Sequence, residues 1–171
     1  MTGHIPIEFP TKPYIRAYLL AVLGEQPVMV PSHKIGRKFF DLLQHSINKD
    51  RTDFRPGAYR VNIKVFISVD LFNHRGACIN ETNIRNFNLF MEEEIKDRFH
   101  FMMDTYVDML PSFEAHLPTV RKKLNIDLEE WSDDSMKKSY WRYRKAKNLP
   151  LLYKKTYGVS VPSDKAENEP F

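Results

Sequence analysis

The chain has 171 residues, 42% of them hydrophobic and 13% aromatic, with a formal net charge of +4. This length fits one domain, or one domain with a small appended module, and the apolar content excludes a disordered chain. One cysteine, Cys78, excludes an intrachain disulfide and suits a reducing compartment. The sequence starts without the regions of a secretory signal, and its longest apolar run, 17–23, is too short for a membrane span. We therefore expect a soluble, cytoplasmic protein with no membrane partner, located in the host cytoplasm or the virion if it is viral.

The first part of the chain predicts a short strand followed by two helices. Ile5–Phe9 alternates weakly, as a strand does, and Thr11 is a candidate N-cap for a helix that ends at Gly24. A second helix is predicted over 32–47, with its first residue, a serine, as the N-cap. The polar stretch 48–57 then predicts an exposed loop.

The clearest strand signal is Tyr59–Phe72, in which every second residue is apolar. This pattern predicts a half-buried, antiparallel-type strand with one face in water. A turn is expected after it, at 73–76. Polar residues near the strand end, Asp70, His74 and Arg75, are either turn residues or part of a site, and the sequence leaves both open.

A long helix is predicted from Asn80 to about Leu110. Asn80 is the candidate N-cap, and apolar residues recur at spacings of three and four until Pro111. The acidic residues of this helix, Glu92–Glu94 and Asp97, have a spacing that can bind Mg²⁺. An acidic stretch on a long helix is far more often its solvated face, so we assign no metal to it.

The charge changes in the last third of the chain. Residues 119–157 contain eleven Lys and Arg against five Asp and Glu, so this part is more basic than the protein as a whole. Pro118 predicts a short helix over 118–125, and Ser132 is the candidate N-cap of a longer helix that ends near Asn148. A short helix, a connector and a longer basic helix give a helix-turn-helix-like outline.

The longer helix has two faces on a helical wheel. Met136, Tyr140, Tyr143 and Ala146 gather on one side, which we expect to face inward. A tryptophan amid charges is costly to leave exposed, so we expect it to meet a partner or another part of the chain. The residues expected on the outer side are Lys137, Lys138, Trp141, Arg142, Arg144 and Lys145.

Basic residues interleaved with aromatic ones suit a polyanion, because Lys and Arg neutralise phosphates while aromatic rings pack on sugars or bases. We therefore predict a non-enzymatic nucleic-acid-binding protein, with duplex DNA as the expected partner. RNA is a further candidate ligand. Alternatively, the helix has no ligand, and its charges only keep the protein in solution. The predicted nucleic-acid-binding residues are Lys137, Lys138, Trp141, Arg142, Arg144, Lys145, Lys147, Lys154 and Lys155.

A second interpretation is a structural or assembly subunit of a larger viral or cellular complex. The basic helix and the tail would then dock on an acidic protein surface, and a homo-oligomer or larger assembly is expected. The stretch SYWRYRKAK after a mixed domain resembles small accessory proteins of phages and mobile elements that handle DNA. This resemblance covers only the basic C-terminal region, and it implies no particular functional residues.

No reaction is indicated by the sequence. The six histidines are scattered, and phosphate-cradling glycine loops and the GxSxG motif do not occur. Cys78 has no activating base beside it in sequence, so a structural thiol is the default. We therefore predict no catalytic residue, cofactor, metal or small-molecule substrate.

Together the elements predict an α+β protein. An N-terminal mixed domain, 1–112, would contain the long antiparallel-type strand and three helices. A small basic helical module with a helix-turn-helix-like outline is expected at 113–157, followed by a flexible tail at 158–171.

Overall fold

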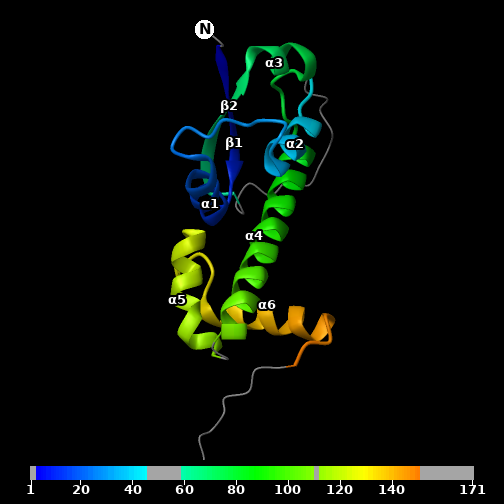
Figure 1. The fold of residues 1–171 in the computed structure, drawn as a ribbon. Coiled ribbons are helices and arrows are strands. Elements are labelled where there is room, and N and C mark those ends of the chain that lie inside the picture. Colours follow the sequence, from blue (N-terminus) through cyan, green and yellow to red (C-terminus); the bar gives the residue numbers. More distant parts are fainter. Residues whose placement is uncertain (1–2, 46–58, 110–111, 151–171) are drawn as a thin grey trace, which may run out of the picture.

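The computed structural model describes residues 3–45, 59–109 and 112–150. This part is a mixed α+β structure with a two-stranded antiparallel sheet, in agreement with the predicted class. Figure 1 shows α4 running along the molecule, with the sheet, α1 and α2 beside one half and α5 and α6 at the other end. The elements are β1 (His4–Thr11), α1 (Pro13–Leu23), α2 (Lys34–Asp41), β2 (Val61–Ser68), α3 (Val69–Arg75), α4 (Glu81–Met109), α5 (Phe113–Leu124) and α6 (Asp133–Ala146).

The two strands pair from His4 opposite Ser68 to Thr11 opposite Val61. Side chains alternate along each strand, so one face of the sheet is buried, as the period-2 pattern predicts. The apolar side chains that the strands bury are Ile7, Phe9, Ile63, Val65 and Ile67.

The strand predicted at Tyr59–Phe72 is longer than the observed strand β2, because α3 begins at Val69, inside the predicted range. Ser68 Oγ accepts a hydrogen bond from the Leu71 N–H at 3.3 Å and caps α3. The turn predicted next is the end of α3 and its C-cap, Gly76, which has φ 79°. A Cβ at Gly76 would lie 2.2 Å from the carbonyl oxygen of Gln44, so this position requires glycine.

Thr11 does not cap the first helix. It ends β1, and its Oγ1 donates to Asn88 Oδ1 on α4 at 2.7 Å, fully buried. The N-cap of α1 is Lys12, without a side-chain capping bond, and Gly24 ends the helix as predicted. The Thr11 hydroxyl, which the sequence pattern predicts to cap α1, is therefore hydrogen-bonded to the buried Asn88 amide instead.

The second helix is shorter than the one predicted over 32–47. His33 rather than Ser32 is the N-cap of α2, and its Nδ1 accepts from the Ile35 N–H at 3.3 Å. The helix ends at Asp41. The end of the predicted helix and the loop predicted after it lie outside the described residues.

The long helix agrees with its prediction. Asn80 is its N-cap, since Asn80 Oδ1 accepts from the Asn83 N–H at 2.7 Å. The helix has 29 residues, which at 1.5 Å per residue gives about 44 Å. Its buried stripe packs against the sheet in one half and against α5 and α6 in the other: Ile84, Phe87, Met91, Ile95, Phe99, Met103 and Val107.

The last two helices pack on the C-terminal half of α4. α5 begins earlier than predicted, with Ser112 as its N-cap, so Pro118 lies inside the helix rather than in its first turn. Ser132 caps α6 as predicted and accepts from the Ser135 N–H at 3.4 Å. The domain division at 112 stays a prediction, and the predicted tail lies outside the described residues.

Candidate nucleic-acid interface

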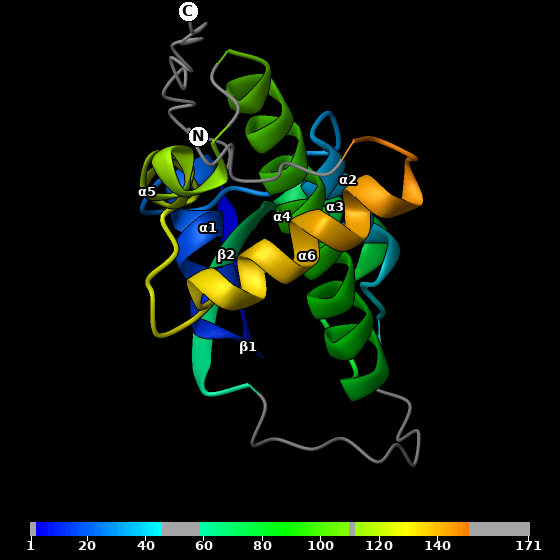
Figure 2. The ribbon, with the colours of Figure 1, turned by 90° about the horizontal axis from the view of Figure 1, so that it is seen from below.

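α6 lies across the C-terminal half of α4 (Figures 1 and 2), where a polar cluster around Asp104 holds it. Asp104 Oδ1 accepts from the Tyr140 hydroxyl at 2.7 Å and from Arg144 Nη1 at 3.2 Å. Asp104 Oδ2 accepts from the Tyr143 hydroxyl at 2.8 Å. Burial, and next the hydrogen bond to Asp104, raise the pKa of Tyr140, so its hydroxyl remains protonated and donates.

Arg144 is buried, with 6% of its surface exposed, so its predicted place on the outer face of the helix is wrong. Its Nε donates to the carbonyl oxygen of Pro150 at 2.8 Å, and its Nη1 donates to the Tyr140 hydroxyl at 2.8 Å. The wheel angle misleads because the long side chain reaches beneath α6 to Asp104. Arg144 therefore belongs to the inner face, and its Nε and Nη1 donate to groups of the protein itself.

Aromatic rings make up much of the inner face. Met136 and Tyr140 are fully buried and Tyr143 is half-buried, as the wheel predicts, whereas Ala146 is exposed. The ring of His100 on α4 stacks on Tyr143, with centroids 4.4 Å apart. These contacts seat the middle of α6 against α4.

Arg121 on α5 fixes the start of α6. Its Nη1 donates to the carbonyl oxygen of Asp127 at 2.9 Å. Its Nη2 donates to the carbonyl oxygen of Trp131 at 2.8 Å and to Asp133 Oδ1 at 2.5 Å. These bonds close the connector 125–132 onto α5, so α6 is held at its start as well as in its middle.

The outward side of α6 carries most of the other predicted site residues. Lys138, Trp141, Arg142 and Lys145 are exposed, and their spacing of three and four places them on one side of the helix. Lys147, at the C-cap, is also exposed. We call these five residues the basic face. Among the described residues, none of its four cations forms an ion pair, so no described carboxylate neutralises their charge.

Lys137 lies between the inner and outer sides of α6. It is half-buried, and its Nζ is 2.5 Å from Glu114 Oε1 on α5. The same Nζ lies over the ring of Trp141, 5.2 Å from its centroid. Trp141 thus packs on one side against a residue one turn earlier on its own helix and remains 41% exposed, so its contact with a partner stays a prediction. Lys137 supports the tryptophan and is only in part available to a ligand.

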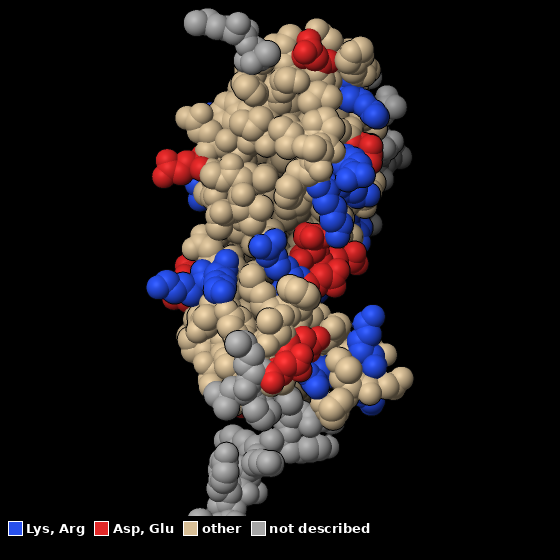
Figure 3. Space-filling model, in the orientation of Figure 1, with Lys and Arg blue, Asp and Glu red and all other residues tan. Residues whose placement is uncertain are grey.

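Lys154 and Lys155 lie outside the described residues. Figure 3 shows basic side chains over α6 at the lower right and acidic side chains above them over α4. On α4, Glu93 and Asp97 are exposed, which agrees with the solvated face predicted for this helix. The basic face therefore borders an acidic surface on the side toward the middle of α4.

The polar residues near the end of β2 lie on α3. Asp70 is in its first turn and His74 and Arg75 are in its last, the order that the helix dipole favours. Their placement is explained without a binding role. In the part of the chain that the structure describes, no group of three or more His, Cys, Asp or Glu could hold a metal ion. Within the same residues, no helix has both the length and the apolar character needed to cross a membrane.

The sequence patterns do not reveal Asp104 and Arg121 as the residues that position α6. In the sequence, Asp104 resembles the other acidic residues of a solvated helix face, and Arg121 is one of many basic residues. The four-residue spacing of Tyr140 and Arg144 is the one local signal of their pairing. Comparison with protein-family models, with curated proteins and with solved structures found no match to this chain.

Proposed function

We propose that the protein is a non-enzymatic nucleic-acid-binding protein and that the basic face of α6 is its contact surface. One observation carries the proposal: three cations without an ion pair among the described residues share one side of a helix with an exposed tryptophan, and Lys147 follows at the C-cap. Each cation can neutralise a phosphate and release a counterion, and Trp141 can pack on a sugar or base. Because Asp104 and Arg121 hold the helix, little backbone ordering is needed on binding.

Duplex DNA is the proposed ligand. α6 has 14 residues, about 21 Å of helix, and a B-DNA major groove about 12 Å wide admits a helix. The connector 125–132 is longer than the turn of about three to four residues in a helix-turn-helix. The proposal therefore rests on α6 and does not need α5 to act as the first helix of that motif.

The test is fluorescence anisotropy with labelled duplex and single-stranded probes at several salt concentrations. The triple substitution Lys138→Ala, Arg142→Ala and Lys145→Ala should weaken duplex binding. It should also reduce the slope of log affinity against log salt by up to about 2.7, because each neutralised phosphate adds about 0.9 to that slope.

A matched control removes the same charge from other exposed positions: Arg16→Ala, Arg37→Ala and Lys122→Ala, on α1, α2 and α5. This control should bind nearly as well as the wild-type protein. Equal losses in the two triple variants would show that binding follows net charge alone. Absent or salt-independent binding of the wild-type protein would refute the proposal, and a tighter single-stranded complex would refute duplex DNA as the ligand.

A role as an assembly subunit is the second candidate, and an exposed aromatic residue on α4 favours it. Phe101 is 72% exposed and borders a hollow of about 350 Å³ that Glu94, Arg98 and Met102 also line. An apolar ring beside a hollow suits a protein contact. Light scattering over a range of concentrations tests this role, because an assembly through this surface should be lost in Phe101→Ser and retained in the triple basic variant.

A further inference from the structure

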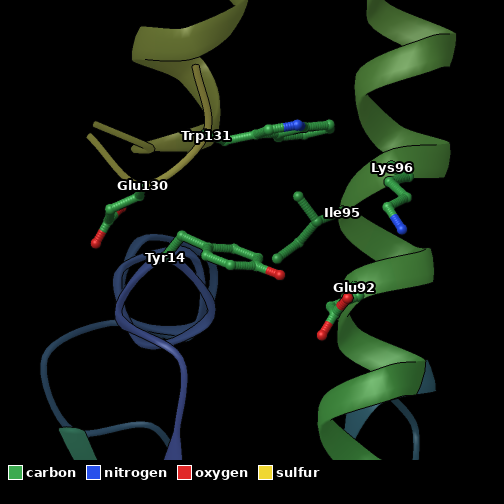
Figure 4. Close-up of a pocket in the computed structure, with 6 residues that line it drawn as sticks. All are labelled: Tyr14, Glu92, Ile95, Lys96, Glu130 and Trp131. Carbon is green, nitrogen blue, oxygen red and sulfur yellow. The ribbon is translucent and has the colours of Figure 1, made fainter. Parts of the chain in front are cut away.

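A small pocket lies between α1, α4 and the connector 125–132. Figure 4 shows the ring of Tyr14 and the indole of Trp131 on opposite sides of it, both nearly edge-on, with Ile95 beside the gap. The pocket has a volume of about 90 Å³. Trp131 is held by an edge contact with Phe99, at a centroid distance of 5.1 Å. Two aromatic rings thus face a space that suits one small chemical group.

Three charged side chains also line the pocket: Glu92, Lys96 and Glu130. Glu92 lies 2.5 Å from Lys12 Nζ, so this carboxylate is neutralised by an ion pair. Glu130 accepts a hydrogen bond from the Asp127 N–H at 3.3 Å, but it forms no ion pair with any described residue. Burial raises the pKa of the Glu130 carboxyl. The charge of Glu130 is therefore partly desolvated and is not paired with a described cation, and Figure 4 shows its side chain on the side of Tyr14 away from Trp131.

We propose that this pocket binds the methylated ammonium group of an organic cation between Tyr14 and Trp131, with the Glu130 carboxylate at the side of Tyr14 that faces the wider hollow. The faces of aromatic rings carry negative potential and attract a cation that lies over them. A methylated ammonium group is large and weakly hydrated, so it leaves water more readily than a metal ion and fills an apolar space. Lys96 is exposed, which leaves its own ammonium group in water. The inference is independent of nucleic-acid binding.

A wider hollow of about 570 Å³ adjoins the pocket and shares Tyr14 and Glu130 with it. Asp127, Glu129 and Arg60 line this hollow, so it offers charged and polar contacts to the rest of a ligand. The methylated ammonium group can therefore belong to a free small molecule or to a methylated lysine in a peptide. The chemistry inside the pocket is the same for both.

Trp131 provides the test. The protein has two tryptophans, so Trp141→Phe leaves Trp131 as the only indole reporter. Choline should change its fluorescence saturably, and 3,3-dimethylbutan-1-ol, a neutral molecule of the same shape, should bind at least about tenfold more weakly. Equal binding of the two would show an apolar cavity and overturn the proposal. Choline binding is measured at Trp131, whereas nucleic-acid binding is measured at the basic face of α6, so failure of one is distinct from failure of the other.

A pair of neighbouring variants locates the site. Glu130→Gln keeps the shape of the side chain and should weaken choline binding by about fivefold or more. Glu129→Gln changes an exposed carboxylate that lines only the wider hollow, and it should alter choline binding by less than about twofold. Thermal unfolding of both variants checks the fold. Unchanged choline binding in Glu130→Gln, or equal losses in both variants, would overturn the assignment.

The source of the group is distinguished with peptides in the same assay. A peptide with trimethyllysine that binds more tightly than choline identifies a methylated lysine, with the peptide chain in the wider hollow. Choline that binds at least as tightly as this peptide identifies a free small molecule. An unmethylated peptide that matches the trimethyllysine peptide, or no saturable change with any of these probes, overturns the proposal.

Discussion

Arg144 Nη1 donates a hydrogen bond to Asp104 Oδ1 at 3.2 Å and so joins the inner face of α6 to α4. Two residues earlier, Arg142 is exposed and forms no ion pair with a described residue. One basic segment therefore contains arginines with different environments. Arg144 positions the helix, whereas Arg142 is available to a partner, so stability and binding should separate on mutation.

Arg144→Met should lower the free energy of unfolding by roughly 2–4 kcal/mol, because it leaves the Asp104 charge without its cation. The Asp104 side chain is 25% exposed, so water offsets part of the loss and the effect stays below that of a fully buried pair. Urea denaturation followed by circular dichroism measures it. Arg142→Met is the control and should change stability by less than about 0.5 kcal/mol. Equal losses would contradict the positioning role of Arg144.

Substitution of two glycines with positive φ distinguishes the cost of backbone strain from the cost of a steric clash. Gly24 has φ 86°, and no atom lies within 4 Å of the place that a Cβ would take, whereas a Cβ at Gly76 meets the carbonyl oxygen of Gln44. Gly24→Ala should therefore cost about 1 kcal/mol, from the left-handed backbone alone. Gly76→Ala should cost at least about 2 kcal/mol more, because backbone must move. Thermal unfolding of both variants measures the difference, and similar costs would show that the Gln44 segment shifts freely.

His100 gives stability a dependence on pH. It is buried, its Nε2 lies 3.0 Å from Ser139 Oγ, and burial lowers its pKa against the opposing charges of Asp97 and Asp104. The unfolded chain therefore takes up this proton more readily than the folded protein. The stabilising contribution is present above the unfolded pKa of about 6.5 and is lost as pH falls through it toward the folded value.

We expect the free energy of unfolding to decrease between about pH 7.5 and pH 5.5, with a smaller slope in His100→Gln. His74→Gln, at an exposed position on α3, is the control and should keep the wild-type slope. Urea denaturation at a series of pH values measures these slopes. An unchanged slope in His100→Gln would assign the pH dependence to other groups.

The elements that the sequence predicts well are those whose signals are local. Asn80 and Ser132 cap α4 and α6 as expected, because a side-chain oxygen next to the first turn needs no distant partner. Thr11 has the same local signal, but Asn88 on α4 engages its hydroxyl. The prediction of its role fails because the competing acceptor is distant in sequence.

The same limit applies to the candidate sites. The outer side of α6 follows from helical period, which correctly places Lys138, Arg142 and Lys145 in solvent. The burial of Arg144 depends on the position of α4 relative to α6, and a helical wheel describes only the residues of one helix. The pocket formed by Tyr14 and Trp131 joins α1 to the connector before α6, so no local pattern could predict it.

Trp141→Ala and Arg142→Ala should weaken nucleic-acid binding in different ways. Arg142 neutralises a phosphate in the proposed complex, so its loss should reduce the salt slope by about 0.9. Trp141 contributes an uncharged ring that packs on a sugar in the proposed duplex complex, so its loss should lower affinity by roughly 1–2 kcal/mol with the salt slope unchanged. Anisotropy titrations at four or more salt concentrations give both quantities. A changed slope in Trp141→Ala would mean that the ring acts by placing Lys137, whose Nζ lies 5.2 Å from its centroid, and the stacking role would be withdrawn.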